Sequence, residues 1–448
     1  MKRRFIAVVG LALLALVAFG GRARATDTTR ELLVILRAKG EITEEQYQAL
    51  LAQLDADAAA KAKTAAAKPG QEWLDRFSLF GDMRVRGEGF YQKDVDDRDR
   101  FRVRARLGVT AKASDELDGT VRIATGDPND PISTNQTLTN LFTRKPVSLD
   151  QAYLTFKPSS TFGWDRPYLT LTGGKLPGTV VRPKAQMGSE LVFDDDITPE
   201  GFNEVASLVD SKDGLVRKLT LQGAEWSAQE MATASDSWIF GGQGLTSLGL
   251  GAATVTVSFG DYYLSNANRI AQQANTDTVL TITNDVVLKD GTVAGGTPLK
   301  VDPANPIVRY RGGFNILNPN VQVGIPTWSS SWPATVFVDF AHNTAAQRKP
   351  DGYWIGASLG QTVNPGDFAV SAMYAQTETN AVISALSFSD FGKSGGTNLK
   401  GPAIKLEWMP LSRLVLSVKN HFVTFIDAPA GKSNATLNRL QVDAQYSF

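Results

Sequence analysis

The sequence predicts an all-β fold, a transmembrane antiparallel β-barrel of about sixteen strands preceded by a short N-terminal helical segment. Three observations predict it. Apolar and polar residues alternate along many segments, these segments are about 10–14 residues long, and short connections alternate with long ones. Soluble strands average about 5–6 residues, whereas a tilted strand needs about 9–11 residues to cross a bilayer. A membrane barrel with short turns at one end and long loops at the other accounts for all three observations.

The first segment, residues 1–25, has the pattern of a secretory signal peptide. Basic residues 2–4 precede the apolar run Phe5–Gly21, and Ala23-Arg24-Ala25 provides a small-residue cleavage site. An uncleaved anchor is the alternative. Cleavage removes five of the 46 basic residues and leaves 41 against 46 acidic ones, a net charge of −5. We therefore expect an exported, mildly acidic protein, with no charge to support nucleic-acid binding.

The composition excludes several other classes of protein. The chain has no Cys and only 2 His, so a disulfide scaffold or a thiolate metal site is excluded. A helical membrane protein needs several apolar runs of about 20 residues, and only the signal contains a long one. Aromatic residues make up 9% of the chain and apolar segments recur throughout, which argues against disorder.

Residues 26–70 are expected to form a helical hairpin and a linker. Leu32, Leu33, Ile35 and Leu36 follow a helical period, and Thr43-Glu44-Glu45-Gln46 matches a capping box. Pro69-Gly70 marks the linker. We place this segment in the periplasm, where it could mediate oligomerisation or a tether, with a solvated spacer as the alternative. Residues 71–448 are then the barrel domain.

Alternation is strictest over Asp99–Lys112, where Phe101 and Leu107 lie on one face and arginines on the other. The last segment, Leu440–Phe448, alternates in the same way. Aromatic residues gather near strand ends, as an interfacial girdle requires; they include Trp164, Trp354, Trp408 and Tyr446. In lipid every backbone polar group must be paired within the protein, so such a sheet must close on itself. We expect strands near 77–90, 99–112, 118–126, 149–157, 167–175, 200–209, 216–227, 236–246, 251–263, 307–317, 334–343, 352–361, 367–377, 398–409, 413–425 and 437–448.

At this point several motifs resemble the putative porin family of bacterial outer membranes, and more distantly the phosphate-selective and general porins. The matching pieces are Arg104–Gly108, Arg122–Gly126, Ser133–Gln136, Leu149–Tyr153, Gly173–Lys175, the turn Lys39–Thr43 and, most specifically, Leu191–Gly201. Phe193 stands where members of the family tend to have Trp. The resemblance implies a sixteen-stranded passive channel, a homotrimer, and insertion machinery that recognises the C-terminal Phe448.

The two-residue period assigns one set of arginines to the lumen, if apolar residues face lipid. Asp82 and Glu88 fall on the same face and neutralise part of the charge. Such a basic wall could bias permeation, since fields in a narrow passage act over about 8 Å at physiological salt. Pairing that only stiffens the barrel is the alternative. The wall comprises Arg84, Arg86, Arg100, Arg102, Arg104, Arg106 and Arg122, with Arg309 and Arg311 added from a later strand.

The connection 176–199 is the candidate constriction loop. It ends in the acidic residues Asp194, Asp195 and Asp196, followed by Glu200. Folded inward, it would place acids against the arginine wall; left outside, it would be a solvated surface. Three adjacent carboxylates could also bind Ca²⁺, although their spacing matches no calcium motif.

We expect no enzyme, since His342 and His421 fall on different strands and no G-x-S-x-G elbow accompanies them. No metal site and no cofactor is expected either. The sequence thus favours an outer-membrane porin for passive diffusion of small hydrophilic solutes or ions, with a weak anion preference and with lipid around it. The alternative is a structural barrel that tethers the membrane to the cell wall or to a partner through its N-terminal helices.

Overall fold

The computed structural model describes residues 37, 43–52, 73–178, 182–277, 279–393 and 395–448. The chain divides into two compact units, residues 1–77 with 160–163, and residues 78–159 with 164–448. In the first unit a helix over 44–52 begins at the expected capping box, which is confirmed: Thr43 N–H donates to Gln46 Oε1 at 2.9 Å, and Gln46 N–H donates to Thr43 Oγ1 at 3.2 Å. The signal peptide and most of the 26–70 hairpin lie outside the described residues.

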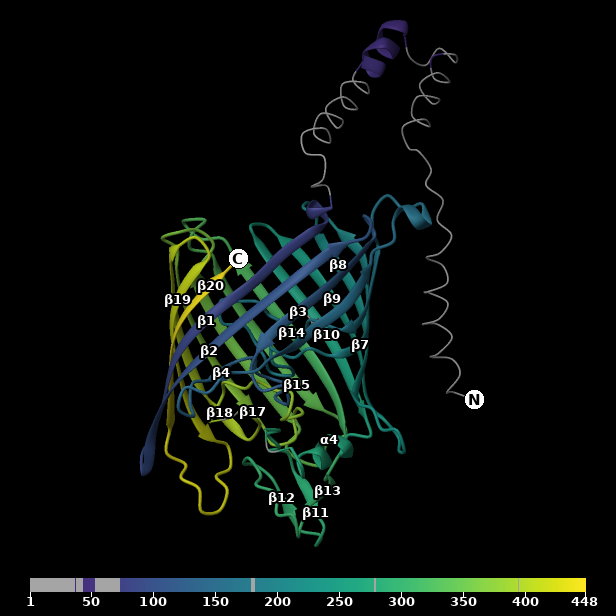
Figure 1. Cartoon of the computed structure of the whole chain (residues 1–448). Coiled ribbons are helices and arrows are strands. Elements are labelled where there is room, and N and C mark those ends of the chain that lie inside the picture. Colours follow the sequence, from purple (N-terminus) through teal and green to yellow (C-terminus); the bar gives the residue numbers. More distant parts are fainter. Residues whose placement is uncertain (1–36, 38–42, 53–72, 179–181, 278, 394) are drawn as a thin grey trace. The chain divides into compact units, whose positions relative to one another are not determined.

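The second unit is the barrel, and its main sheet contains 17 strands: sixteen barrel strands and the two-residue β4 (Gln136–Thr137). The predicted fold class and strand number are confirmed (Figure 1). The barrel strands are β1 (Phe77–Gln92), β2 (Val95–Lys112), β3 (Leu117–Thr125), β5 (Val147–Phe156), β6 (Leu169–Lys175), β7 (Glu200–Asp210), β8 (Val216–Gln229), β9 (Ser237–Leu250), β10 (Ala253–Ser265), β14 (Phe314–Ile325), β15 (Ala334–Asn343), β16 (Asp351–Gly360), β17 (Phe368–Thr377), β18 (Leu399–Leu411), β19 (Leu414–Phe425) and β20 (Leu437–Ser447).

The sheet closes where β1 pairs antiparallel with β20, from Asp82 opposite Ser447 to Gln92 opposite Leu437. At the end of this seam, Gly81 N–H donates to the Phe448 carbonyl at 3.1 Å and Phe448 N–H donates to the Gly81 carbonyl at 3.0 Å. Closure leaves no unpaired edge, which is what a sheet in lipid requires.

The two faces of the strands differ as the period predicts. On β2, Phe101 is 65% exposed and Leu107 47%, whereas Arg102 is 8% exposed and Arg104 6%. Apolar side chains therefore lie outside and charged ones inside. Among the described residues, no helix has the length and apolarity that a membrane crossing requires.

Connections differ at the two ends of the barrel. At the end where β1 begins and β20 ends, strands are joined by segments such as 113–116 and 251–252. At the other end, which we call the loop end, lie the long connections 126–146, 176–199, 266–313 and 378–398. The connection 266–313 contains α4 (Asn268–Gln273) and a small sheet of β11 (Val286–Leu288), β12 (Val293–Ala294) and β13 (Ile307–Tyr310), at the bottom of Figure 1.

Two sequence-based predictions are corrected here. The expected strand 307–317 is interrupted: β13 belongs to the small sheet, and the barrel strand β14 begins at Phe314 and continues to Ile325. Its Asn and Pro residues suggest a turn by composition, yet Asn318 faces inward and donates to Asp339 at 2.7 Å. Trp354, predicted for an interfacial girdle, is 2% exposed and lies inside the barrel. Trp164, Trp408 and Tyr446 are 37%, 45% and 45% exposed, as a girdle requires.

Candidate functional site

The arginine wall lies on the inner face of three neighbouring strands. Arg84 and Arg86 come from β1, Arg100 to Arg106 from β2 and Arg122 from β3, and each is buried or half-buried. Arg309 and Arg311 do not join them, which corrects the prediction. Arg309 is in β13 of the small sheet, and Arg311 follows it, with its N–H bonded to the Asp285 carbonyl at 2.8 Å. Because the barrel strand begins only at Phe314, both arginines lie outside the barrel wall.

Carboxylates neutralise most of this wall at short range. Asp82 accepts from Arg104 at 2.8 Å and from Arg106 at 2.7 Å, so one acid holds two neighbouring guanidinium groups. Arg122 pairs with Asp150 at 2.5 Å. Charge-assisted pairs of this kind fix the direction of each side chain as well as its charge.

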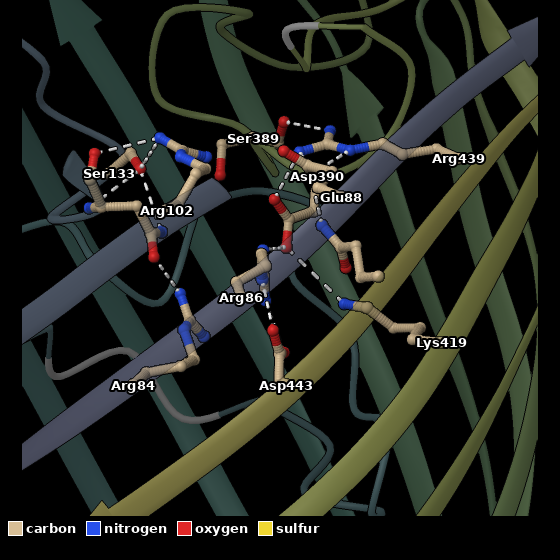
Figure 2. Close-up of polar contacts among 12 residues, drawn as sticks. Arg84, Arg86, Glu88, Arg102, Ser133, Ser389, Asp390, Lys419, Arg439 and Asp443 are labelled. Carbon is tan, nitrogen blue, oxygen red and sulfur yellow. Dashed lines mark hydrogen bonds and ion pairs between the residues drawn. The ribbon is translucent and has the colours of Figure 1, made fainter. Parts of the chain in front are cut away.

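Arg86 and Arg439 meet a second set of acids, shown in Figure 2. Arg86 bonds Asp443 of β20 at 2.7 Å and Asp390 at 2.9 Å. Arg439, only 1% exposed, bonds Asp390 at 2.8 Å and Glu88 at 2.6 Å, and Glu88 also pairs with Arg100. Alternation with Leu440 and Val442 places Arg439 on the inner face of the last strand. Asp390 lies in the connection 378–398, where no sequence pattern marks it.

Two arginines of the wall have no carboxylate within ion-pair distance among the described residues. Arg84 donates to Asn135 Oδ1 at 2.5 Å, and Arg102 donates to the Asn135 carbonyl at 3.0 Å and to Ser133 Oγ at 3.3 Å. Neutral oxygen atoms of the connection 126–146 thus occupy the places where the other arginines have an acid. The wall keeps uncompensated positive charge at this place.

The connection 176–199 enters the barrel, and its acids separate. Asp196 bonds Arg106 at 3.1 Å and accepts the N–H and the hydroxyl of Thr134, both at 3.2 Å. Asp194 is 3% exposed and faces another loop. The side chains of Asp195 and Glu200 are 71% and 63% exposed, and they pair with Arg182 at 3.2 Å and Lys175 at 2.8 Å. The four acids predicted as one group therefore have three different environments.

Apolar contacts hold this loop against the strands opposite the arginine wall. Phe193 packs edge-on against Trp226 of β8 at 5.5 Å and Tyr262 of β10 at 5.2 Å between ring centroids. Leu191 and Ile197 are buried in the same cluster. The loop ends where Gly201 has φ +147 and a Cβ would lie 2.0 Å from the Glu225 carbonyl, so only glycine fits.

A second loop, 378–398, also folds into the barrel, and no pattern in its sequence predicts this. Its Phe388 contacts Trp354 at 5.3 Å and His421 at 5.9 Å between centroids, and Phe391 contacts the same two rings. The loop therefore packs on the Trp354 ring, and this contact explains why Trp354 is buried. The connection 266–313 buttresses the loop in turn: Asn284 donates to the Thr379 carbonyl at 2.7 Å and accepts Ser384 N–H at 2.9 Å.

The pKa values of the loop carboxyls are shifted in opposite directions, depending on whether an arginine lies beside the buried group. Burial and the neighbouring Asp196 raise the pKa of Asp194 to about 8, and burial beside Asp194 raises the pKa of Glu190. Asp390 is buried too, but Arg86 and Arg439 hold its pKa well below its usual range. The loop acids therefore include one group that protonates near neutral pH and one that stays ionised.

The histidines form no catalytic pair in the structure. His342 lies on β15, and its Nδ1 is 2.6 Å from Oδ1 of Asp351 at the start of β16. His421 lies on β19, and its ring contacts Phe388 and Phe391. Across the described ranges, no group of three His, Asp or Glu side chains has the geometry to hold a metal ion.

Comparison with known proteins confirms the resemblance found in the sequence. A family model described as "Putative porin" matches residues 90–294. All of the quoted motifs except the turn 39–43 fall within that range. The solved structure of OprB of Pseudomonas putida at high pH shares the fold, with a TM-score of 0.51 and 11% identity over 84% of this chain and 96% of that one. OmpF of Salmonella typhi in complex with daunomycin aligns with a TM-score of 0.48 and 9% identity over 84% of this chain and 99% of that one. No curated protein matches the chain.

Proposed function

We propose that this chain, a porin-type outer-membrane barrel that matches the putative porin family over residues 90–294, conducts small hydrophilic solutes and ions by passive diffusion. The single observation that carries the proposal is the closed barrel with apolar side chains outside and a charged wall inside. A barrel of about sixteen strands is wide enough for a lumen, whereas about eight strands are filled by their own side chains. Stability alone is a weak explanation for this buried charge cluster, since buried ion pairs add little net stability.

The lumen is narrowed from one side. The loops 176–199 and 378–398 pack on buried apolar side chains of β8, β10, β16 and β19. Their acids Asp196 and Asp390 form ion pairs with the arginine wall. Solutes would pass between opposed charges, which orient water and dipolar solutes and retard apolar ones. We infer that these two loops form the constriction.

We assign a weak anion preference to the channel. Most arginines of the wall form ion pairs with acids, which limits the positive electrostatic potential in the lumen. Arg84 and Arg102 instead bond neutral oxygens of Asn135. The remaining positive charge would raise the local concentration of anions. The exposed acids Asp195 and Glu200 and the acidic mature chain act against it, so the preference is small.

The same proposal includes the setting of the barrel. We place it in the bacterial outer membrane as a homotrimer surrounded by lipid, with residues 26–70 in the periplasm, no catalytic activity and no nucleic-acid partner. Phe448, at the end of the seam with β1, would be the residue that the insertion machinery recognises.

Purified protein in planar lipid bilayers tests this function directly. Stepwise conductance increases in KCl are expected as single molecules insert. The absence of steps from protein that has folded and inserted would overturn the channel proposal.

A further inference from the structure

A polar cavity of about 250 Å³ lies against the arginine wall at the loop end of the barrel. Its charged lining consists of Arg100, Arg102, Lys393 and Arg439, with Asp130 as the one acid among the described lining residues. Ser133 and Ser389 add polar groups. Four cations around one small space is a strong bias towards a negatively charged occupant.

Within this lining, Arg102 is the group whose charge is not matched. Arg100 and Arg439 already pair with Glu88, and Arg439 also pairs with Asp390. Arg102 is 8% exposed, donates only from Nη2, and its Nε has no hydrogen-bond partner among the described residues. Figure 2 shows it turned towards Ser133, apart from the acids around Arg86. A buried guanidinium without a counter-ion is costly unless an anion reaches it.

Asp130 does not supply that anion. Its Oδ1 accepts the N–H of Ile132 at 3.1 Å, and it forms no ion pair with Arg102 in the described structure. Burial also raises the pKa of this carboxyl to about 6, so its negative charge is lost as the pH falls below about 6.

We propose that this cavity binds a small oxyanion group, the carboxylate, sulfate or phosphate of a passing solute, with the Arg102 guanidinium as its main contact. The proposal rests on the proposed function, because the solute reaches the cavity through the channel. A planar guanidinium edge matches two oxygens of one oxyanion, which a halide cannot do.

The surrounding charges provide an approach to the site. Lys393 lines both this cavity and a neighbouring one of about 580 Å³, whose charged lining also includes Lys300, Lys432 and one acid, Asp94. Basic side chains therefore continue from the loops to Arg102, and they would raise the local concentration of oxyanions at the entrance.

Single-channel recording in KCl, with sodium sulfate, phosphate or acetate added at constant ionic strength, tests the site. We expect each oxyanion to reduce the chloride current saturably, and Arg102→Gln to raise the half-blocking concentration about tenfold or more. Arg102→Lys keeps the positive charge but loses the planar guanidinium edge. Its half-blocking concentration should therefore lie between those of the wild type and Arg102→Gln. Comparison of the three anions tells which oxyanion chemistry the site prefers.

Arg217→Gln is the matched control. Arg217 lies on β8, bonds the Thr254 hydroxyl at 2.9 Å and does not line the cavity, so this variant should keep the wild-type block. If Arg102→Gln does not fold, Lys393→Gln replaces it and should weaken the block as well. Conductance without a saturable block, or equal block in Arg102→Gln and wild type, overturns the site and leaves the channel standing. No conductance at all overturns the channel itself.

Discussion

The Asp194 carboxylate accepts the backbone N–H of Ser389 at 2.8 Å, and this bond joins the two loops that enter the barrel. The same residue donates its own N–H to the Leu386 carbonyl at 2.9 Å. Two segments separated by nearly half of the chain are therefore fastened through one buried acid. Removing that acid should loosen both loops together.

Asp194→Ala is expected to expose the second loop. Loss of a buried hydrogen-bonded carboxylate costs about 1–3 kcal/mol, enough to raise the open population of the loop pair at least several-fold. Because the chain has no cysteine, Ala385→Cys, at a position now 1% exposed, serves as a reporter for maleimide labelling. Labelling should be faster in the Asp194→Ala background. Asp195→Ala, which changes an exposed neighbour, is the control, and equal rates in all three backgrounds would contradict the prediction.

The loop pair should also respond to pH. The pKa of Asp194 is raised to about 8 in the folded loops, above its ordinary value of 3.8, so the packed state favours the protonated form. The packed loops are therefore most stable near pH 4 and lose stability as the pH rises to about 8. Current fluctuations in bilayers should increase over that range. Asp194→Asn cannot ionise, so this variant should reduce the pH dependence of the current fluctuations. Glu190 accounts for the remaining pH dependence, because its pKa is raised as well. An unchanged pH profile in Asp194→Asn would speak against this assignment.

The arginine wall should control ion selectivity. Arg102→Glu combined with Arg104→Glu reverses two charges in the lumen, so the reversal potential in a KCl gradient should move towards the cation side. Arg98→Glu, on the exposed end of the same strand, is the control and should move it much less. If the reversal potential does not shift in the double variant, the wall does not govern permeation.

Phe193 should act as the anchor of the first loop. Phe193→Ala removes a ring that contacts Trp226 and Tyr262, at a typical cost of about 3–5 kcal/mol for a buried Phe. We expect the loop to leave the lumen and the mean single-channel conductance to rise. Phe142→Ala, at a side chain that is 98% exposed, should conduct like the wild type. A conductance unchanged by Phe193→Ala would mean that the loop does not narrow the passage.

Deletion of residues 26–70 distinguishes the channel function from a tethering function. A channel formed by the barrel alone should keep its conductance in bilayers after the deletion. A protein that works as a tether would lose its attachment to cell-wall fragments in a sedimentation assay. Loss of conductance in a deletion variant that still folds would show that the segment belongs to the channel.

The sequence by itself determined the barrel and the charge of its wall. Period two places Arg102 and Phe101 on opposite faces whatever the neighbouring strands are, because adjacent Cβ atoms of a strand point to opposite sides. The same rule would have found Arg439. The rule failed at 307–317, because β13 pairs with β11 of the small sheet, which a local period does not encode.

Tertiary structure alone decided which charges remain unmatched. Whether Arg102 meets an acid or the backbone carbonyl of Asn135 depends on how the connection 126–146 folds back, and no local period encodes that. Alternation with Ile355 places Trp354 on the inner face of β16, but it does not reveal the inward loop that Trp354 contacts. Strand periodicity is a property of consecutive residues, whereas loop packing and ion pairing join residues hundreds of positions apart, so only the folded barrel brings them into contact.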